Sequence, residues 1–228
     1  MEKREFKPFG EVSSLTLGGG GLAQVWGETT REEAVETVKF ALNSGITHFD
    51  VAPMYGKGEA ERVLGESLEG RSIDGLFFTT KCRLGRLPDE KVYDHLNNSL
   101  TRSLETMNIQ KVDLFLLHSQ LVEDDFTLFS NNEFKDRNST TLSSYFNAAI
   151  PAFEQLKKEG KIGSWGIGGI GQNKALISAM NHETPPEAMQ CVINPLNSAG
   201  AIGYVDQAYD PRLIFKNACD NQIPVLAI

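Results

Sequence analysis

The sequence predicts an α/β fold in which helices cover a parallel sheet. Short apolar segments alternate with longer amphipathic ones along all 228 residues. The short segments are hydrophobic on both faces, as is typical of strands buried in a parallel sheet. With 40% hydrophobic residues, the chain can bury one sizeable core, and its length fits one domain as well as two.

Composition excludes several classes of partner. The formal net charge is -8, and no basic run indicates a nucleic-acid or membrane-surface partner. The start of the chain lacks the apolar core of a secretory signal, and no apolar run approaches the length of a membrane span. The three cysteines (Cys82, Cys191 and Cys219) are far apart, which argues against a disulfide framework or a zinc site. We therefore expect a cytoplasmic protein without a bound metal.

The first elements follow in a regular order. A strand over residues 14–17 runs into four glycines, Gly18–Gly21. No Lys-Ser/Thr pair follows as it would in a phosphate-binding P-loop, so we expect a loop that lets another backbone or a ligand approach closely. A capping box at residues 30–33 starts a helix that stops at Gly45. The next strand, over 46–52, breaks at Pro53.

The alternation then repeats. Apolar spacing predicts a helix over 59–68 and a strand over 75–80. A proline and two acids at 88–90 suit the first turn of a long helix over 88–107. A continuous apolar run predicts a strand over 112–117.

Residues 120–144 form a long, polar and acidic connection. Loops of that length are either functional lids or surface insertions, and both explanations stay open. Glycine- and alanine-bearing residues 194–210 form another loop. The remaining elements are helices over 145–159, 174–180 and 212–219, and strands over 162–167, 188–193 and 223–228.

Seven strands without a Rossmann glycine fingerprint favour a parallel (β/α)8 barrel of the TIM type over a doubly wound sheet. Such a barrel needs eight strands and roughly 250 residues. The chain stops inside the apolar run 224–228, so we expect one barrel domain over 1–228 whose last helix–strand–helix portion is missing. Its two edges would expose unpaired backbone groups. The alternative is a naturally open barrel.

Four ionisable side chains follow three successive strands, at the end where a parallel barrel carries its ligand sites. Asp50 and Tyr55 follow the second strand, Lys81 the third and His118 the fourth. Each of them alone has an ordinary structural explanation. Together, at the same end of neighbouring strands, they predict one site.

These four residue types make one coherent mechanism. A phenol with the ordinary pKa near 10 exchanges protons poorly at neutral pH, and correcting that takes about 4 kcal/mol. A lysine cation about 4 Å away supplies about that much at an effective dielectric of 20. Such a buried lysine needs a counter-ion, for which Asp50 is the candidate. His118 could orient a substrate carbonyl while Tyr55 protonates it, or the reverse reaction could deprotonate an alcohol. None of the four donates hydride, so a cofactor such as a nicotinamide is required.

Four blocks of the sequence resemble the motifs of a known enzyme family. The blocks Phe49–Glu66, Phe78–Lys81, Val112–His118 and Gly160–Ile167 resemble, in order, the motifs of the aldo-keto reductase family. The resemblance implies a (β/α)8 barrel that uses NADPH or NADH to reduce aldehydes and ketones, or to oxidise alcohols and lactols, and it favours NADP(H) over NAD(H). It also implies that Tyr55 is the general acid/base.

The same resemblance assigns the remaining roles. Lys81 and Asp50 would tune Tyr55, and His118 would orient the carbonyl. Gln190 matches a position that bonds the nicotinamide carboxamide. The family often has a Ser-Asn pair after the fifth strand, where this sequence has Gly168-Gly169, so any cofactor contact there has to come from backbone or from elsewhere.

The family grips the rest of its cofactor with residues that would lie beyond Ile228. We therefore expect these 228 residues alone to have little or no reductase activity. The block around Met54 resembles members acting on sugars and sugar-like aldehydes, so the expected partner is a small-molecule carbonyl or sugar. Two rivals stay open: an aldolase that forms a Schiff base on Lys81, and a non-catalytic barrel that binds a nucleotide or a partner.

Overall fold

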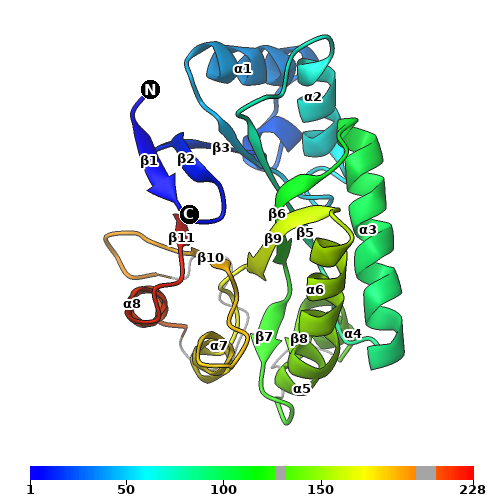
Figure 1. The fold of residues 1–228 in the computed structure, drawn as a ribbon, viewed down its shortest axis with the longest axis vertical. Coiled ribbons are helices and arrows are strands. Elements are labelled where there is room, and N and C mark those ends of the chain that lie inside the picture. The colour runs from blue at the N-terminus through cyan, green and yellow to red at the C-terminus, as the bar shows by residue number, and fades with distance from the viewer. Residues whose placement is uncertain (127–131, 199–208) are drawn as a thin grey trace. The chain divides into compact units, whose positions relative to one another are not determined.

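The computed structural model describes residues 1–126, 132–198 and 209–228. Seven strands form one sheet in the order β11-β10-β9-β6-β5-β4-β3, which is the order of the chain in reverse (Figure 1). The pairs β3–β4, β4–β5, β9–β10 and β10–β11 are parallel. The predicted α/β fold with seven strands is confirmed, and helices connect the strands as they do in a (β/α) barrel.

The chain divides into two compact units. The first unit comprises residues 1–82, 97–115 and 160–163, and the second comprises 83–96, 116–159 and 164–228. The helix α3 (Val92–Met107) and the strands β6 (Val112–Leu117) and β9 (Ile162–Ile167) each pass from one unit into the other.

The first unit holds the elements that precede Arg83. They are β1 (Lys3–Phe6), β2 (Gly10–Ser13), β3 (Thr16–Gly18), the 3₁₀ turn η1 (Gly21–Ala23), α1 (Arg31–Asn43), β4 (His48–Asp50), α2 (Glu59–Leu68) and β5 (Phe77–Cys82). Helices α1 and α2 lie side by side (Figure 1). Thr30 caps α1 with the predicted capping box.

Apolar side chains pack the strands of the first unit against its helices. The Phe49 and Phe78 rings of β4 and β5 stack with centroids 6.1 Å apart. Val63 and Leu64 of α2 are fully buried. A Cβ atom on Gly65 would lie 2.7 Å from the Thr106 carbonyl oxygen of α3, so glycine allows this close helix contact.

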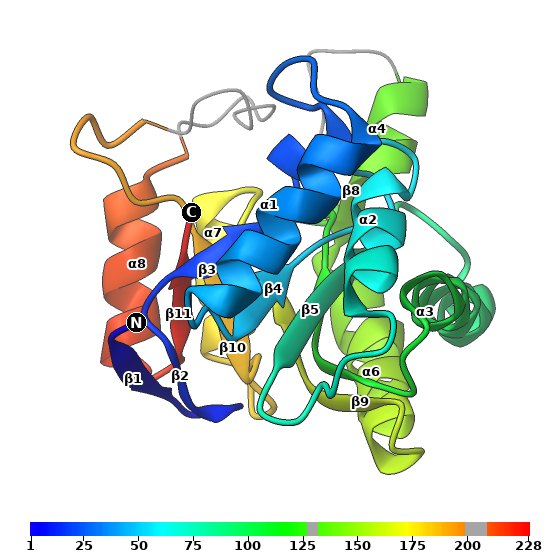
Figure 2. The same ribbon diagram turned by 90° about the horizontal axis from the view of Figure 1, so that it is seen from above.

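The second unit holds the elements that follow. They are η2 (Asp89–Lys91), β7 (Gln120–Val122), α4 (Asn132–Asn138), β8 (Ser139–Thr141), α5 (Leu142–Ser144), the π turn η3 (Tyr145–Ala149), α6 (Ile150–Lys158), α7 (Asn173–Met180), β10 (Ala188–Cys191), α8 (Pro211–Asp220) and β11 (Val225–Ala227). Helix α7 packs against α8 (Figure 2). In the described ranges, no helix is both long and apolar enough to cross a membrane.

Two expectations about the chain need correction. The β1–β2 hairpin at the N-terminus was not predicted. Residues 120–144 do not form one continuous loop, because β7, α4, β8 and α5 lie within them. The hydroxyl of Thr140 donates to the Gly85 carbonyl at 3.0 Å, so a polar residue is buried there with its hydrogen bond satisfied. Residues 127–131, and 199–208 of the later loop, lie outside the described residues. The choice between a functional lid and a surface insertion stays open.

Candidate active site

Lys81 lies at the centre of a polar cluster in the first unit, which also contains Asp50 and Tyr55. Its side chain leaves the end of β5 and is fully buried. The Nζ atom lies 2.6 Å from Asp50 Oδ1, 3.2 Å from the Val51 carbonyl oxygen and 3.1 Å from Tyr55 Oη. An ammonium group has three N–H donors, so these three acceptors use all of them.

The charge of Asp50 keeps Lys81 protonated. Burial by itself lowers the pKa of Lys81, but the negative charge of Asp50, together with Tyr55, outweighs burial and raises that pKa above its ordinary value. A Schiff base requires a neutral amine. The raised pKa therefore weighs against the alternative in which Lys81 is the nucleophile of an aldolase.

Tyr55 lies in the turn that follows β4. Its N–H donates to the Ala52 carbonyl at 3.0 Å, and its side chain is half-buried. The ammonium of Lys81 lies 4.8 Å from the centroid of the phenol ring. Because Lys81 has only donors, Tyr55 Oη accepts in their contact, and the phenol hydrogen is not consumed by it.

A buried histidine beneath this cluster escaped the sequence analysis. His48 lies two residues before Asp50, so both side chains emerge from the same face of β4. Its ring nitrogens lie 2.8 Å from the hydroxyls of Thr16 on β3 and Thr79 on β5. Burial, reinforced by the charge of Lys81 and opposed by that of Asp50, lowers the pKa of His48 to about 4. The ring is therefore neutral and ties three neighbouring strands together.

A buried carboxyl on the other face of β5 was also missed. Thr80 points away from Lys81 and donates to Glu61 Oε1 of α2 at 2.7 Å. Burial raises the pKa of Glu61, while its hydrogen-bonded neighbours and the positive charge of Lys81 act in the opposite direction. The neighbours of Thr80, Thr79 and Lys81, are both polar, so no alternation in the sequence indicated which way Thr80 points or which residue it contacts.

In the second unit, the structure brings the other predicted residues to neighbouring strand ends. His118 follows the last residue of β6, and the Gly168 N–H donates to the Leu117 carbonyl at 2.8 Å. Gly169 has φ +60°, and a Cβ atom on it would lie 1.8 Å from the Gln190 carbonyl oxygen. Gln190 lies on β10 and is almost completely buried.

The cofactor contact predicted for the two glycines stays a prediction, and the structure shows what their backbone groups bond to within the protein. The N–H of Gly168 is bonded within the protein, and the Gly169 carbonyl accepts from the Tyr209 hydroxyl at 2.5 Å. The absence of a side chain at Gly169 is explained by the close approach of the β10 backbone. Among the residues predicted to contact the cofactor, Gln190 has a side chain that can hydrogen-bond a carboxamide, because an amide both donates and accepts.

The structure therefore describes two groups of predicted residues. Asp50, Tyr55 and Lys81 come together in the first unit. In the second unit, His118 follows β6 and Gln190 lies on β10, and the two glycines follow β9, the strand between them. That both groups form one site stays a prediction. The described residues contain no cluster of three His, Cys, Asp or Glu side chains that could hold a metal ion.

Comparison with known proteins assigns the family. Residues 14–227 match the sequence profile of the Aldo/keto reductase family. The chain belongs to this family, as the four sequence motifs indicated. The family profile covers every element from β3 to β11.

Two curated relatives each align with at least 70% of this chain. L-galactose dehydrogenase of Arabidopsis thaliana is 27% identical over 176 residues, which are 75% of this chain and 50% of the relative. NADH-specific methylglyoxal reductase of Escherichia coli is 25% identical over 178 residues, or 70% of this chain and 49% of the relative. The chain spans about half the length of these curated relatives.

Solved structures support the fold. An aldo-keto reductase of Bacillus halodurans in its holo form superposes with a TM-score of 0.72 at 20% identity. The alignment covers 100% of this chain and 65% of the Bacillus chain. A Bombyx mori aldo-keto reductase in complex with NADP has a TM-score of 0.68 at 18% identity, over 99% of this chain and 65% of its own. The seven-stranded sheet therefore has the architecture of the aldo-keto reductase barrel.

Proposed function

We propose that this chain carries the proton-transfer site of an oxidoreductase that interconverts a carbonyl and an alcohol. The observation that carries the proposal is the contact between Lys81 Nζ and Tyr55 Oη, at 3.1 Å. A buried cation beside a phenol oxygen stabilises the negative charge that develops there as the phenol gives its proton to a carbonyl oxygen. Family membership supports the same reaction class.

Each residue of the cluster has a defined part in this proposal. Tyr55 gives its proton to the oxygen of a carbonyl during reduction, and takes it back from an alcohol during oxidation. Lys81 donates to the phenol oxygen in both states, and Asp50 holds the charge on Lys81. His118 orients the carbonyl oxygen. A nicotinamide cofactor would supply or accept the hydride.

Gln190 is the residue that would hold the nicotinamide carboxamide. We propose NADP(H) as the cofactor rather than NAD(H), on the strength of the Bombyx mori reductase solved with NADP. The name of the NADH-specific relative from Escherichia coli points the other way. Comparing turnover with NADPH and with NADH at equal concentrations decides between the two.

The substrate class is a small carbonyl compound or a sugar. The name of the Arabidopsis relative, L-galactose dehydrogenase, supports a sugar lactol, and that of the Escherichia coli relative supports a small aldehyde. Both substrates present one polarised carbon–oxygen bond to Tyr55. A panel of aldoses and short aldehydes, assayed in both reaction directions, tests this class.

The decisive experiment replaces Tyr55 in the protein at the length that its natural source produces. Tyr55→Phe keeps the ring but removes the exchangeable proton. We expect NADPH-dependent reduction of para-nitrobenzaldehyde to fall at least about 100-fold, the usual lower bound for a general acid. The matched control is Tyr93→Phe, because the Tyr93 hydroxyl donates to the exposed Glu159 carboxylate.

The control should keep full activity. Unchanged turnover in Tyr55→Phe would overturn the proposal that Tyr55 is the proton donor. Nucleotide binding without turnover in the wild-type protein would instead favour the non-catalytic role. Trapping of a substrate on Lys81 by borohydride would instead favour the aldolase.

A further inference from the structure

The turn that carries Tyr55 into α2 has an uncommon backbone conformation. Gly56, Lys57 and Gly58 have φ angles of +59°, +55° and +86°, so three successive residues lie in the left-handed region. Lysine adopts that region at a steric cost. The Tyr55 carbonyl accepts from the Ala60 N–H at 3.4 Å, so the phenol and the helix are joined by a short connection. The shape of this turn fixes where Tyr55 lies.

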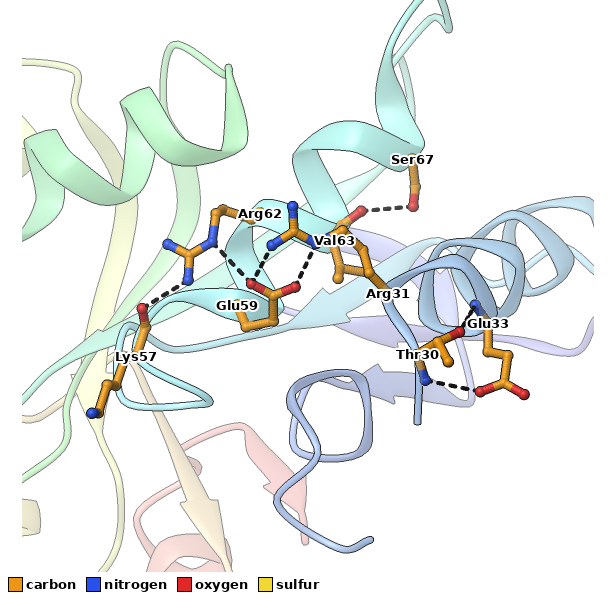
Figure 3. A network of polar contacts seen from close by, with 8 residues as sticks. All are labelled: Thr30, Arg31, Glu33, Lys57, Glu59, Arg62, Val63 and Ser67. Carbon is orange, nitrogen blue, oxygen red and sulfur yellow. Dashed lines mark hydrogen bonds and ion pairs between the residues drawn. The ribbon is translucent and has the colours of Figure 1, made fainter. Parts of the chain in front are cut away.

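Arg62 ties the turn to the helix that follows it. Its Nη2 atom donates to the Lys57 carbonyl at 3.0 Å, and its Nε atom donates to Glu59 Oε2 at 3.0 Å (Figure 3). A Cβ atom on Gly58 would lie 3.3 Å from Arg62 Nη1, so the guanidinium lies directly over the turn. The carbonyl that the left-handed Lys57 turns outward thus has a charged donor.

Glu59 extends the connection to α1. Arg31, the first residue of α1, donates through Nε and Nη2 to the two carboxylate oxygens of Glu59, both at 2.7 Å (Figure 3). The Glu59 side chain is only 18% exposed, although the two arginines are nearly half exposed. The hydrogen bonds from Arg31 and Arg62 hold the pKa of Glu59 below its ordinary value, with Arg31 the larger cause. The carboxylate is therefore charged whenever the protein is near neutral pH.

We infer that Arg31, Glu59 and Arg62 form a positioning network for Tyr55, which holds the left-handed turn and so keeps the phenol oxygen against Lys81. The inference rests on the proposed function of Tyr55. It goes further, because it assigns a role in the reaction to three charged residues that do not touch the reacting atoms. Arg62 is the member that contacts the turn itself.

Such a network would matter because the phenol oxygen of Tyr55 can move only a few tenths of an ångström before its contact with Lys81 weakens. The contact between Lys81 Nζ and Tyr55 Oη is 3.1 Å, and a hydrogen bond weakens quickly beyond about 3.5 Å. Lys81 is fixed by Asp50 and by the Val51 carbonyl, so Lys81 has little freedom to follow a displaced phenol. Misplacement of a catalytic group by about 1 Å can lower a rate about 100-fold.

The test compares two ion pairs of the same kind. Arg62–Glu59 and Lys39–Glu36 both join residues three apart on a helix, but only the first contacts the turn. Arg62→Met should lower kcat about tenfold, with the KM for the aldehyde unchanged, because a displaced phenol affects proton transfer and leaves ground-state binding intact. Lys39→Met should leave kcat unchanged. Arg62→Lys, which keeps a cation that can donate to the turn, should recover most of the loss.

A spectroscopic readout separates positioning from folding. The NMR signals of the Tyr55 ring, assigned by comparison with Tyr55→Phe, should move in Arg62→Met and stay in place in Lys39→Met. An equal loss of kcat in Arg62→Met and Lys39→Met, or unmoved Tyr55 signals with wild-type kcat in Arg62→Met, would overturn the inference. If Tyr55→Phe keeps full activity, it is the proposed function that fails, whereas an inactive Tyr55→Phe beside a fully active Arg62→Met defeats the positioning network alone.

Discussion

Two groups of ion pairs in the first unit differ in burial. The Lys81 and Asp50 side chains are 0% and 10% exposed, whereas Arg31, Glu59 and Arg62 are 47%, 18% and 46% exposed. Water screens the second group and hardly reaches the first. Because burial differs, we expect the buried pair to act on the proton of Tyr55 and the exposed group to hold the shape of the turn.

The energetic cost of the two groups differs for the same reason. Breaking a buried pair leaves one charge without either water or partner, which is far more costly than breaking an exposed pair. The pKa of Lys81 is raised, so the charge of Asp50, together with Tyr55, outweighs the effect of burial. We expect mutations in the buried pair to reduce both stability and activity, and mutations in the exposed group to reduce activity alone.

Removing the charge of Asp50 should have the largest effect. Asp50→Asn leaves Lys81 buried without a counter-ion, so the free energy of unfolding should fall by about 3–5 kcal/mol. Urea denaturation followed by circular dichroism measures this loss.

Glu59→Gln, which removes the same charge from the exposed group, is the control and should change the unfolding midpoint much less. The double variant Asp50→Asn with Lys81→Met should recover most of the loss, since no buried charge remains. A loss below about 1 kcal/mol in Asp50→Asn would show that water reaches Lys81.

The buried His48 should make stability depend on pH. Its pKa is about 4 in the folded protein and 6.5 when the chain is unfolded, so only the unfolded state takes up a proton between those values. Stability is therefore fully present above pH 6.5 and is lost as the pH falls towards 4. The difference between these two pKa values corresponds to about 3 kcal/mol in the free energy of unfolding. Buried carboxyls such as Glu61, whose pKa is raised, act in the opposite direction.

Comparison with His48→Asn isolates the contribution of this ring. The difference in unfolding free energy between wild type and variant should shrink as the pH falls from 7 to 5. The ring signals of His48 should not titrate in this range in the folded protein. Parallel stability profiles for the two proteins would contradict the low pKa.

Much of the fold was readable because strands and helices leave different periodicities. The seven strands of the main sheet and the capping box at Thr30 were predicted from those patterns and are confirmed. The β1–β2 hairpin was missed because Phe6, Val12 and Ser13 are its only buried residues, which gives little alternation. Its rings nevertheless join the core, as Phe9 in the connecting turn stacks on Phe77 at 5.1 Å.

The candidate site was readable only in part. Strand ends identified Asp50 and Lys81, because the end of a parallel strand is a position that the sequence defines. The partners of His48 depend on strand register, in which Thr16 lies opposite His48. The bond between Arg31 and Glu59 joins residues 28 apart and depends on how α1 packs against α2. Neither relation leaves a local pattern, so the sequence could not reveal them.

The smallest expected effect lies in the turn itself. Asparagine adopts the left-handed region more readily than lysine, so Lys57→Asn should raise the free energy of unfolding by about 0.5 kcal/mol, part of the steric cost that a left-handed residue carries. Arg62 donates to the backbone carbonyl of Lys57, which the substitution keeps, so kcat should not fall. Thermal unfolding of matched samples measures the gain. Lys57→Ala is the control, because alanine pays the same steric cost and should gain nothing. An equal gain in both variants would mean that the lysine charge, and not the backbone conformation, limits stability at this turn.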